Sequence, residues 1–138
     1  MSTIIREVTL DADPESCWDA LRDFSALDKR LAPGFITESR LESPDTRVVT
    51  FFNGAVARER LVGVDDHARR LAYAVIESRF NMAHHNAAAQ IIAGGEGGTR
   101  FVWTTDVLPD ELAAPIGELM EAGLSAIKAN LERDRVPQ

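Results

Sequence analysis

The sequence has a single cysteine, Cys17, among 138 residues. This excludes an intramolecular disulfide framework and any multi-cysteine zinc site. Basic residues are also scarce, because 15 Lys and Arg against 22 Asp and Glu give a formal net charge of −7. That balance opposes binding to nucleic acid or to an anionic membrane surface, both of which need basic side chains. No apolar run approaches the ~20 residues of a membrane span, and residues 1–6 lack the pattern of a signal peptide.

Aromatic residues are few as well, nine in all (six Phe, two Trp and one Tyr). Hydrophobic residues nevertheless make up 45% and charged residues 27%, which is typical of globular proteins. The length is that of one ordinary domain, so we expect a single domain over residues 1–138, located in the cytoplasm. A domain with so few large side chains must pack closely on small residues or enclose a hole.

The first third of the chain predicts one strand followed by two helices. Residues 3–10 are rich in β-branched side chains and indicate a strand. Asp13 can cap a helix that has Pro14 at its first position. A second short helix is expected over residues 25–31, ended by Pro33 and Gly34.

The middle of the chain alternates strand and turn patterns. Asn53-Gly54 between two such patterns is a strong hairpin signal, and residues 94–98 indicate a glycine-rich turn. Apolar spacing then predicts a helix of about 20 residues that begins at Asp110 or at Pro115, with an irregular start. Successive hairpins imply an α+β fold, with an antiparallel sheet of about seven strands packed on this helix. The expected strands after the first are residues 35–41, 47–52, 55–64, 70–77, 83–92 and 99–108.

Several local stretches follow a pattern known from one superfamily. They are residues 13–15 with Trp18, and residues 51–54, 58–61, 64–66, 70–73 and 97–103, followed by the C-terminal helix. On these stretches, and over nearly the whole chain, the sequence resembles the START/Bet v 1-like (SRPBCC) superfamily and its bacterial polyketide cyclase/dehydrase and lipid-transport branch. The resemblance implies the helix-grip fold, a deep cavity between the sheet and the C-terminal helix, and a cavity mouth near residues 33–36 and 80–82.

Strand alternation then assigns side chains to the cavity face. Arg58 and Arg60 are expected to face water, which turns Glu59 inward, and Glu77 is in phase with the inward set of its own strand. His85 is expected inside and His84 outside. A mostly apolar wall with a few polar groups is typical of small-molecule sites. The expected ligand-binding residues are Glu59, Leu61, Tyr73, Val75, His85, Ala87, Phe101, Trp103, Thr105, Met120, Gly123 and Leu124.

Three functions remain open at this point. The first is binding of a small hydrophobic or aromatic ligand in the cavity, with no cofactor. The second is a cofactor-independent cyclase or dehydratase, in which Glu59, His85 or Tyr73 moves a proton. The third is an interaction protein, such as a homodimer formed through an exposed sheet edge.

Other chemistry-bearing residues favour structural roles. His84 and His85 are adjacent on a strand and point to opposite faces, so they do not suit one metal ion, and we expect no metal site. The glycines of residues 94–98 join two strands and lack the Lys-Ser/Thr of a phosphate loop. Cys17 lies on an apolar helix face, where a buried structural thiol is favoured.

Overall fold

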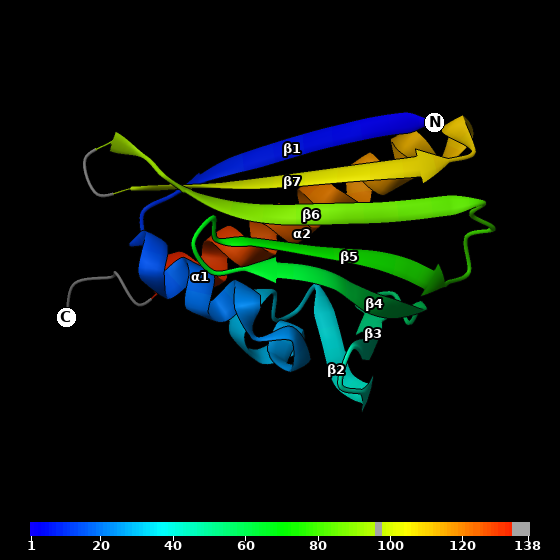
Figure 1. Cartoon of the computed structure of the whole chain (residues 1–138), viewed down its shortest axis with the longest axis horizontal. Helices are drawn as coiled ribbons and strands as arrows, with labels where there is room; N and C mark the ends of the chain where they lie inside the picture. The colour runs from blue at the N-terminus through cyan, green and yellow to red at the C-terminus, as the bar shows by residue number, and fades with distance from the viewer. Residues whose placement is uncertain (96–97, 134–138) are drawn as a thin grey trace.

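The computed structural model describes residues 1–95 and 98–133. Within these residues, seven strands form one antiparallel sheet in the order β1-β7-β6-β5-β4-β3-β2 (Figure 1). The expected α+β fold is confirmed, with short helices between β1 and β2 and a long helix after β7. The strands are β1 Ser2–Leu10, β2 Ile36–Ser43, β3 Thr46–Phe51, β4 Val56–Asp65, β5 Arg70–Glu77, β6 His84–Ala93 and β7 Thr99–Leu108.

Helix α1 (Pro14–Arg22) begins as its sequence predicts. The Asp13 side chain accepts a hydrogen bond of 3.0 Å from the Ser16 backbone N–H, and Pro14 occupies the first turn. Capping of this kind satisfies one of the amides that a helix start leaves without a partner.

The second helix expected over residues 25–31 is instead a short 3₁₀ turn, η1 (Phe24–Ala26), followed by one turn of π-helix, η2 (Leu27–Leu31). The backbone N–H of Ala32 bonds to the Leu27 carbonyl, a wider spacing than in an α-helix. The Asn130 side chain, far away in the sequence, donates to the carbonyls of Arg30 and Leu31. Tertiary contacts therefore shape this segment more than its local helix pattern does.

The turns follow the sequence closely. Gly54 has a φ of 86°, and the backbone N–H of Phe51 bonds to the carbonyl of Ala55 to close the β3–β4 hairpin. Glycine reaches positive φ without the steric cost that a side chain imposes. In the expected turn at 94–98, the Gly94 N–H bonds to the Gly98 carbonyl, and residues 96–97 lie outside the described part of the chain.

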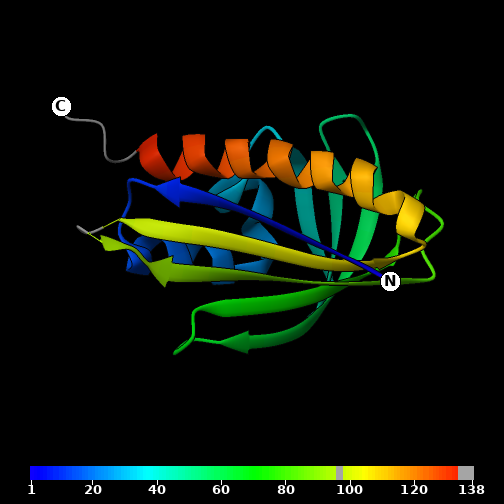
Figure 2. The same cartoon turned by 90° about the horizontal axis from the view of Figure 1, so that it is seen from above.

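The C-terminal helix has the irregular start that the prolines predicted. A 3₁₀ turn, η4 (Asp110–Leu112), leads into α2 (Ala113–Arg133), so the helix begins between the two expected positions. Pro115 then lies in the first turn, where its missing N–H costs no helical hydrogen bond. Figure 2 shows α2 lying along one side of the curved sheet, next to β1.

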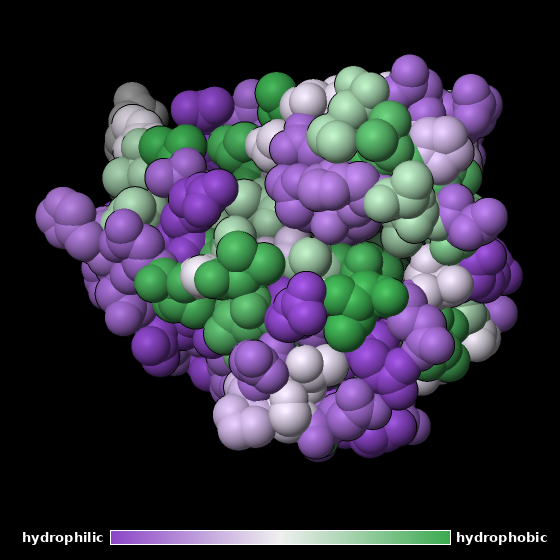
Figure 3. All heavy atoms as spheres, turned by 45° about the vertical axis from the view of Figure 1, so that its right-hand side comes forward, coloured by the Kyte–Doolittle hydropathy of each residue, from purple (hydrophilic) through white to green (hydrophobic). Residues whose placement is uncertain are grey.

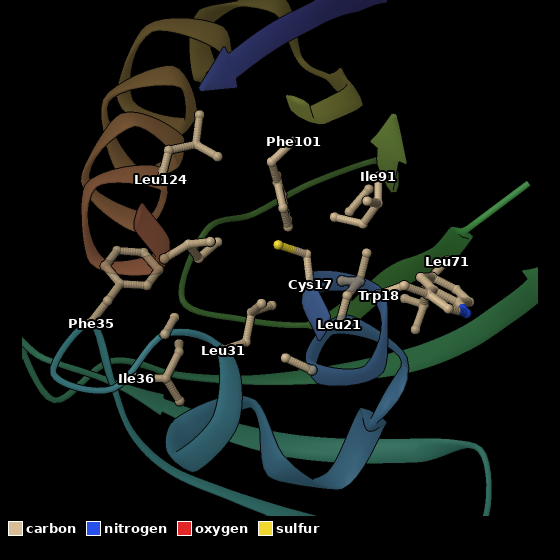
Figure 4. Packing of buried hydrophobic residues seen from close by; sticks show 14 of the residues in the cluster. Cys17, Trp18, Leu21, Leu31, Phe35, Ile36, Leu71, Ile91, Phe101 and Leu124 are labelled. Atoms are coloured by element: carbon tan, nitrogen blue, oxygen red, sulfur yellow. The ribbon is translucent and has the colours of Figure 1, made fainter. Parts of the chain in front are cut away.

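The core fills the space between α1, α2 and the concave face of the sheet. In Figure 4, Leu21 from α1, Phe101 and Ile91 from the sheet, and Leu124 from α2 face a common interior. A smaller cluster nearer the N-terminus of α2 contains Ile4, Val107, Ile116 and Met120. Trp103 packs against both clusters, and the cavity described next lies on the same inward face.

Candidate ligand-binding site

A cavity of about 130 Å³ lies between the concave face of the sheet, α2 and the segment from Leu27 to Ile36. Its wall is mainly aliphatic and aromatic, because the inward positions of β4 to β7 and the apolar stripe of α2 face each other across it. Two stretches form its rim, residues 53–56 and residues 78–82. The polar side chains on the inner wall are Arg47, Glu59, Tyr73, His85, Trp103 and Thr105.

Figure 3 brings forward the end of the molecule at which β5 joins β6 and the rim segment 78–82 lies. Hydrophobic patches there are interrupted by hydrophilic side chains. Within the rim, Phe80 is half-buried and the exposed Arg79 guanidinium lies 5.9 Å from its ring. The surface around this end is therefore mixed in polarity, whereas the interior of the cavity is mainly apolar.

Most of the residues expected to bind a ligand lie on the cavity wall, and a few do not. Three expected residues, Leu61, Ala87 and Leu124, do not line the cavity. Ala87 and Leu124 are buried within the core cluster, and Leu61 packs against that cluster. Alternation selects the inward face of a strand, but it does not say which inward positions are filled by neighbouring side chains. The expected residues that line the cavity are Glu59, Tyr73, Val75, His85, Phe101, Trp103, Thr105, Met120 and Gly123.

Glu59 is buried and forms an ion pair with Arg47 on the neighbouring strand. The two residues are register partners of β3 and β4, and the Arg47 Nε donates to Glu59 Oε1 at 2.9 Å. Arg47 Nη2 lies 2.8 Å from the same oxygen, and Nη1 donates to the carbonyl of Phe24 at 3.1 Å. The guanidinium also stacks over the Phe24 ring at 4.1 Å. Burial of a carboxylate requires such a partner, because an unpaired charge is costly away from water.

Arg47 is a site residue that our sequence analysis missed. A charged residue at the start of a strand is normally placed in water, which is why no inward role was assigned to it. The signal was nevertheless present, since Arg47 is in phase with the buried Val49. Placing Glu59 inside also called for a buried partner; His85 or Tyr73 was expected in that role, and the structure supplies Arg47.

His85 is half-buried, and its ring replaces a missing backbone partner. The β5–β6 ladder ends at the pair Tyr73 and Ala87, and beyond it the Val75 N–H donates to His85 Nδ1 at 3.0 Å. Burial, with a smaller contribution from the charge of His84, lowers the pKa of His85 to about 4. The imidazole is therefore neutral at pH 7, and because Nδ1 accepts, its proton lies on Nε2.

Tyr73 is paired with Trp103 rather than with Glu59 or His85. The Trp103 indole N–H donates to the Tyr73 hydroxyl oxygen at 3.1 Å, and the Tyr73 and His85 rings lie 5.9 Å apart. Burial, followed by the charge of Glu59, raises the pKa of the Tyr73 hydroxyl well above its ordinary value. Within the described residues no hydrogen bond joins any two of Glu59, Tyr73 and His85.

Glu77 was expected on the inward face, and the structure places it outside. A register shift between Arg58 and Glu59 pairs Arg58 with Glu77, and the two side chains form an exposed ion pair. The irregularity changes the alternation at the end of β5, which strand periodicity alone does not predict.

The described part of the chain, residues 1–95 and 98–133, holds neither a metal-binding cluster nor a membrane-spanning helix. No cluster of three or more His, Cys, Asp or Glu side chains suited to a metal ion occurs in that part of the chain. No helix there is long and apolar enough to cross a membrane.

Comparison with known sequences gives a match to one family model. Residues 1–133 match the model described as polyketide cyclase / dehydrase and lipid transport. No curated protein matches the sequence.

Comparison with solved structures gives the same fold. The structure of the protein XoxI from Bacillus cereus has a TM-score of 0.88 at 19% identity, over 99% of this chain and 100% of that one. A START superfamily protein from Mycobacterium smegmatis has a TM-score of 0.78 at 14% identity, over 95% and 97% of the two chains. A protein from Thermobifida fusca is 30% identical, with a TM-score of 0.76 over 96% and 95%. The expected helix-grip architecture is therefore confirmed.

Proposed function

The chain belongs to the polyketide cyclase/dehydrase and lipid transport family, and from this premise we propose that it binds a small hydrophobic or aromatic molecule in its cavity. The observation that carries the proposal is the cavity itself, a mainly apolar space with a few polar groups on its wall. Apolar area supplies affinity in such sites, and sparse polar groups fix the orientation of the ligand.

The volume of the cavity limits the size of the ligand. An apolar protein cavity of about 150 Å³ accepts benzene. A cavity of about 130 Å³ is comparable, so a molecule with one aromatic ring is the best-fitting class.

The protonation states of the wall favour binding over the alternative, a cofactor-independent cyclase or dehydratase. A general acid or base works best when its pKa lies near the working pH. His85, with a pKa of about 4, and Tyr73, with a raised pKa, are both neutral at pH 7. Glu59 is held by Arg47. Catalytic roles for these three residues stay predictions, whereas binding needs only the cavity and its orienting groups.

Thermal unfolding with a panel of single-ring aromatic compounds and short lipids tests the proposal. A ligand that binds only the native state raises the melting temperature by mass action. Ala89→Leu adds bulk to the cavity wall and is expected to abolish the rise. Ala88→Leu is the matched control, because the next residue of β6 points to the opposite face.

A panel in which no compound raises the melting temperature of the native protein would contradict a binding function. An equal rise in Ala89→Leu and in the native protein would place the binding site elsewhere. Circular dichroism of both variants establishes that they are folded.

The proposed partners and location have tests of their own. A homodimer would pair β1 or β2, which lie at the edges of the sheet. β2 carries Glu38, Arg40 and Glu42 and has two register shifts, features that oppose edge pairing. Sedimentation equilibrium separates the two states, since a mass of 15.1 kDa supports a monomer and twice that mass supports the dimer. A cytoplasmic location is part of the proposal and is tested by cell fractionation.

A further inference from the structure

The ion pair on the cavity wall is asymmetric. Arg47 Nε and Nη2 both approach Oε1 of Glu59, at 2.9 and 2.8 Å, and Nη1 is used by the Phe24 carbonyl. No residue in the described parts of the chain donates a hydrogen bond to Oε2 of Glu59. The residue is only 5% exposed, and it lines the cavity. One carboxylate oxygen is therefore left without a protein donor on the wall of a mainly apolar space.

An ionised carboxylate oxygen can only accept hydrogen bonds. Oε2 has no donor among the described residues yet is not among their fully buried polar atoms without a partner, so a donor that enters the cavity can reach it, and a hydrogen bond to a charged oxygen is stronger than one between neutral groups. A hydroxyl group meets this requirement. A second carboxylate or an ether oxygen at the same place would bring two acceptors together and would be disfavoured.

Neutral molecules fit this site better than cations. Arg47 already supplies one positive charge to Glu59, so the pair is balanced. Bringing a further cation into the cavity would cost desolvation without an unbalanced negative charge to offset it. The remaining polar groups nearby, the Tyr73 hydroxyl and the His85 imidazole, are neutral at pH 7.

Strand register places a second polar group on the same wall as this acceptor. Glu59 is the register partner of Val75, whose N–H is bonded to the His85 ring, and Tyr73 lies two residues before Val75 on β5. His85 Nε2–H has no hydrogen-bond partner among residues 1–95 and 98–133. It can donate to a ligand oxygen that itself donates to Glu59. A hydroxyl oxygen can play both parts, which an amine or an ether cannot do equally well.

We propose that the cavity selects a neutral, single-ring aromatic alcohol, a phenol, whose hydroxyl donates to Oε2 of Glu59. This inference rests on the proposed binding function and adds the chemical class of the ligand. The ring occupies the apolar part of the cavity, between Trp103, Phe101 and the α2 residue Met120.

Titrations followed by the NMR signal of the Trp103 indole N–H test the selection, with phenol, toluene, anisole and benzoate as probes. Phenol and toluene have the same size and shape, so their difference isolates the hydroxyl. Phenol is expected to bind the native protein at least tenfold more tightly than toluene. Anisole, which can only accept, should show no gain over toluene, and benzoate should bind more weakly than either.

Glu59→Gln provides the second arm. The amide keeps one oxygen for Arg47 and presents N–H groups in place of Oε2. The advantage of phenol over toluene should fall below about threefold, and anisole should bind more tightly than it binds the native protein. Glu121→Gln makes the same chemical change on the exposed face of α2 and should leave all four affinities unchanged.

The outcomes separate the inference from the function on which it rests. If toluene and phenol bind the native protein equally, the inference is wrong and the binding function stands. If phenol keeps its advantage in folded Glu59→Gln, the hydroxyl does not contact Glu59 and the inference is wrong. If none of the four probes binds the native protein, the inference is wrong, and the thermal-unfolding panel, which also contains short lipids, decides the binding function separately. The native comparison decides the question even if Glu59→Gln fails to fold.

Discussion

At the scale of single residues, the polar groups of the cavity wall are held by specific partners. Arg47 holds Glu59, the Val75 N–H holds His85, and Trp103 holds Tyr73. Each partner comes from a neighbouring strand or from the same layer of side chains. The polar groups of the site are therefore preorganised before any ligand binds. A substitution in one member of a pair should change the position or stability of its partner.

Removing the cation of the buried ion pair should be strongly destabilising. Arg47→Met leaves Glu59 without a partner and is expected to lower the free energy of unfolding by about 3–5 kcal/mol. The double variant Arg47→Met with Glu59→Leu removes both charges and should be more stable than the single variant. Urea unfolding of the three proteins measures the difference. A double variant that is less stable than Arg47→Met would show that desolvation of Glu59 is not the dominant cost.

The protonation of His85 predicts a pH dependence of stability. Its pKa is about 4 in the folded protein and near 6.5 when unfolded, so between these values the unfolded state binds more protons. Neutral, desolvated His85 therefore leaves the free energy of unfolding at its full value above pH 6.5. As the pH falls to about 4, protonation of the unfolded state lowers the free energy of unfolding by up to about 3 kcal/mol. Carboxylates also titrate in this window, so the measurement is the difference in unfolding free energy between the native protein and His85→Gln.

That difference should change between pH 6.5 and 4 and should be constant above pH 7. His67→Gln removes an exposed histidine in a turn and serves as the control. A difference that is flat over the whole range would mean that His85 is not desolvated in the folded protein.

At the scale of elements, α2 approaches the sheet closely because two glycines face it. A β-carbon at Gly123 would lie 3.0 Å from a ring atom of Trp103 and 3.1 Å from one of Phe35. A β-carbon at Gly117 would lie 2.9 Å from Nη2 of Arg6, which is the end of a flexible, partly exposed side chain. Glycine is therefore needed at 123 because two packed rings leave no room for a side chain, whereas at 117 the neighbour is a side chain that can move.

These surroundings predict opposite effects of two identical substitutions. Alanine is favoured over glycine within a helix by about 1 kcal/mol. Gly117→Ala should keep most of that gain, because Arg6 can move, and it should raise the unfolding free energy by about 0.5–1 kcal/mol. Gly123→Ala should lower it by about 1 kcal/mol, because two packed rings must shift. Thermal and urea unfolding measure both, and a stabilising Gly123→Ala would show that the rings move freely.

At the scale of the whole molecule, strand pairing is continuous between β6 and β7 and stops early between β5 and β6. The β6–β7 ladder runs without a break from the pair of His84 and Leu108 to the pair of Ala93 and Thr99. The β5–β6 ladder stops at Tyr73, and the segment that follows forms the rim of the cavity. The route by which a ligand enters is expected at this end.

Hydrogen exchange should report this difference. Amides shared between β6 and β7 should exchange only through global unfolding, whereas those of residues 76–83 should exchange through local opening. A bound ligand should slow the second group most, because it contacts the rim. The prediction is contradicted if both groups exchange at the same rate in the absence of ligand.

The sequence by itself determined the order of the strands, the position of the long C-terminal helix, the hairpin at Asn53-Gly54 and, except at Glu77, the inward face of β4 to β7. These features depend on local backbone preferences and on a period of two or of 3.6 residues, which neighbouring letters reveal. It also placed Glu59, Tyr73 and His85 on one wall. It did not predict the inward role of Arg47, the outward position of Glu77 or the 3₁₀ and π-helical turns after α1, because these depend on register shifts and contacts between distant segments.

Only the tertiary structure decided which polar side chains of the cavity wall pair with each other and which polar atoms stay without a partner. Glu59 takes Arg47 as its partner instead of His85, because the β3–β4 register brings those two side chains together. Both contacts of Arg47 fall on Oε1, so Oε2 of this cavity-lining residue has no donor among the described residues. The small number of aromatic residues in the sequence predicted either close packing on small residues or a cavity. Gly123 packs closely against Trp103 and Phe35, and beside that contact a cavity of about 130 Å³ remains, so the protein has both.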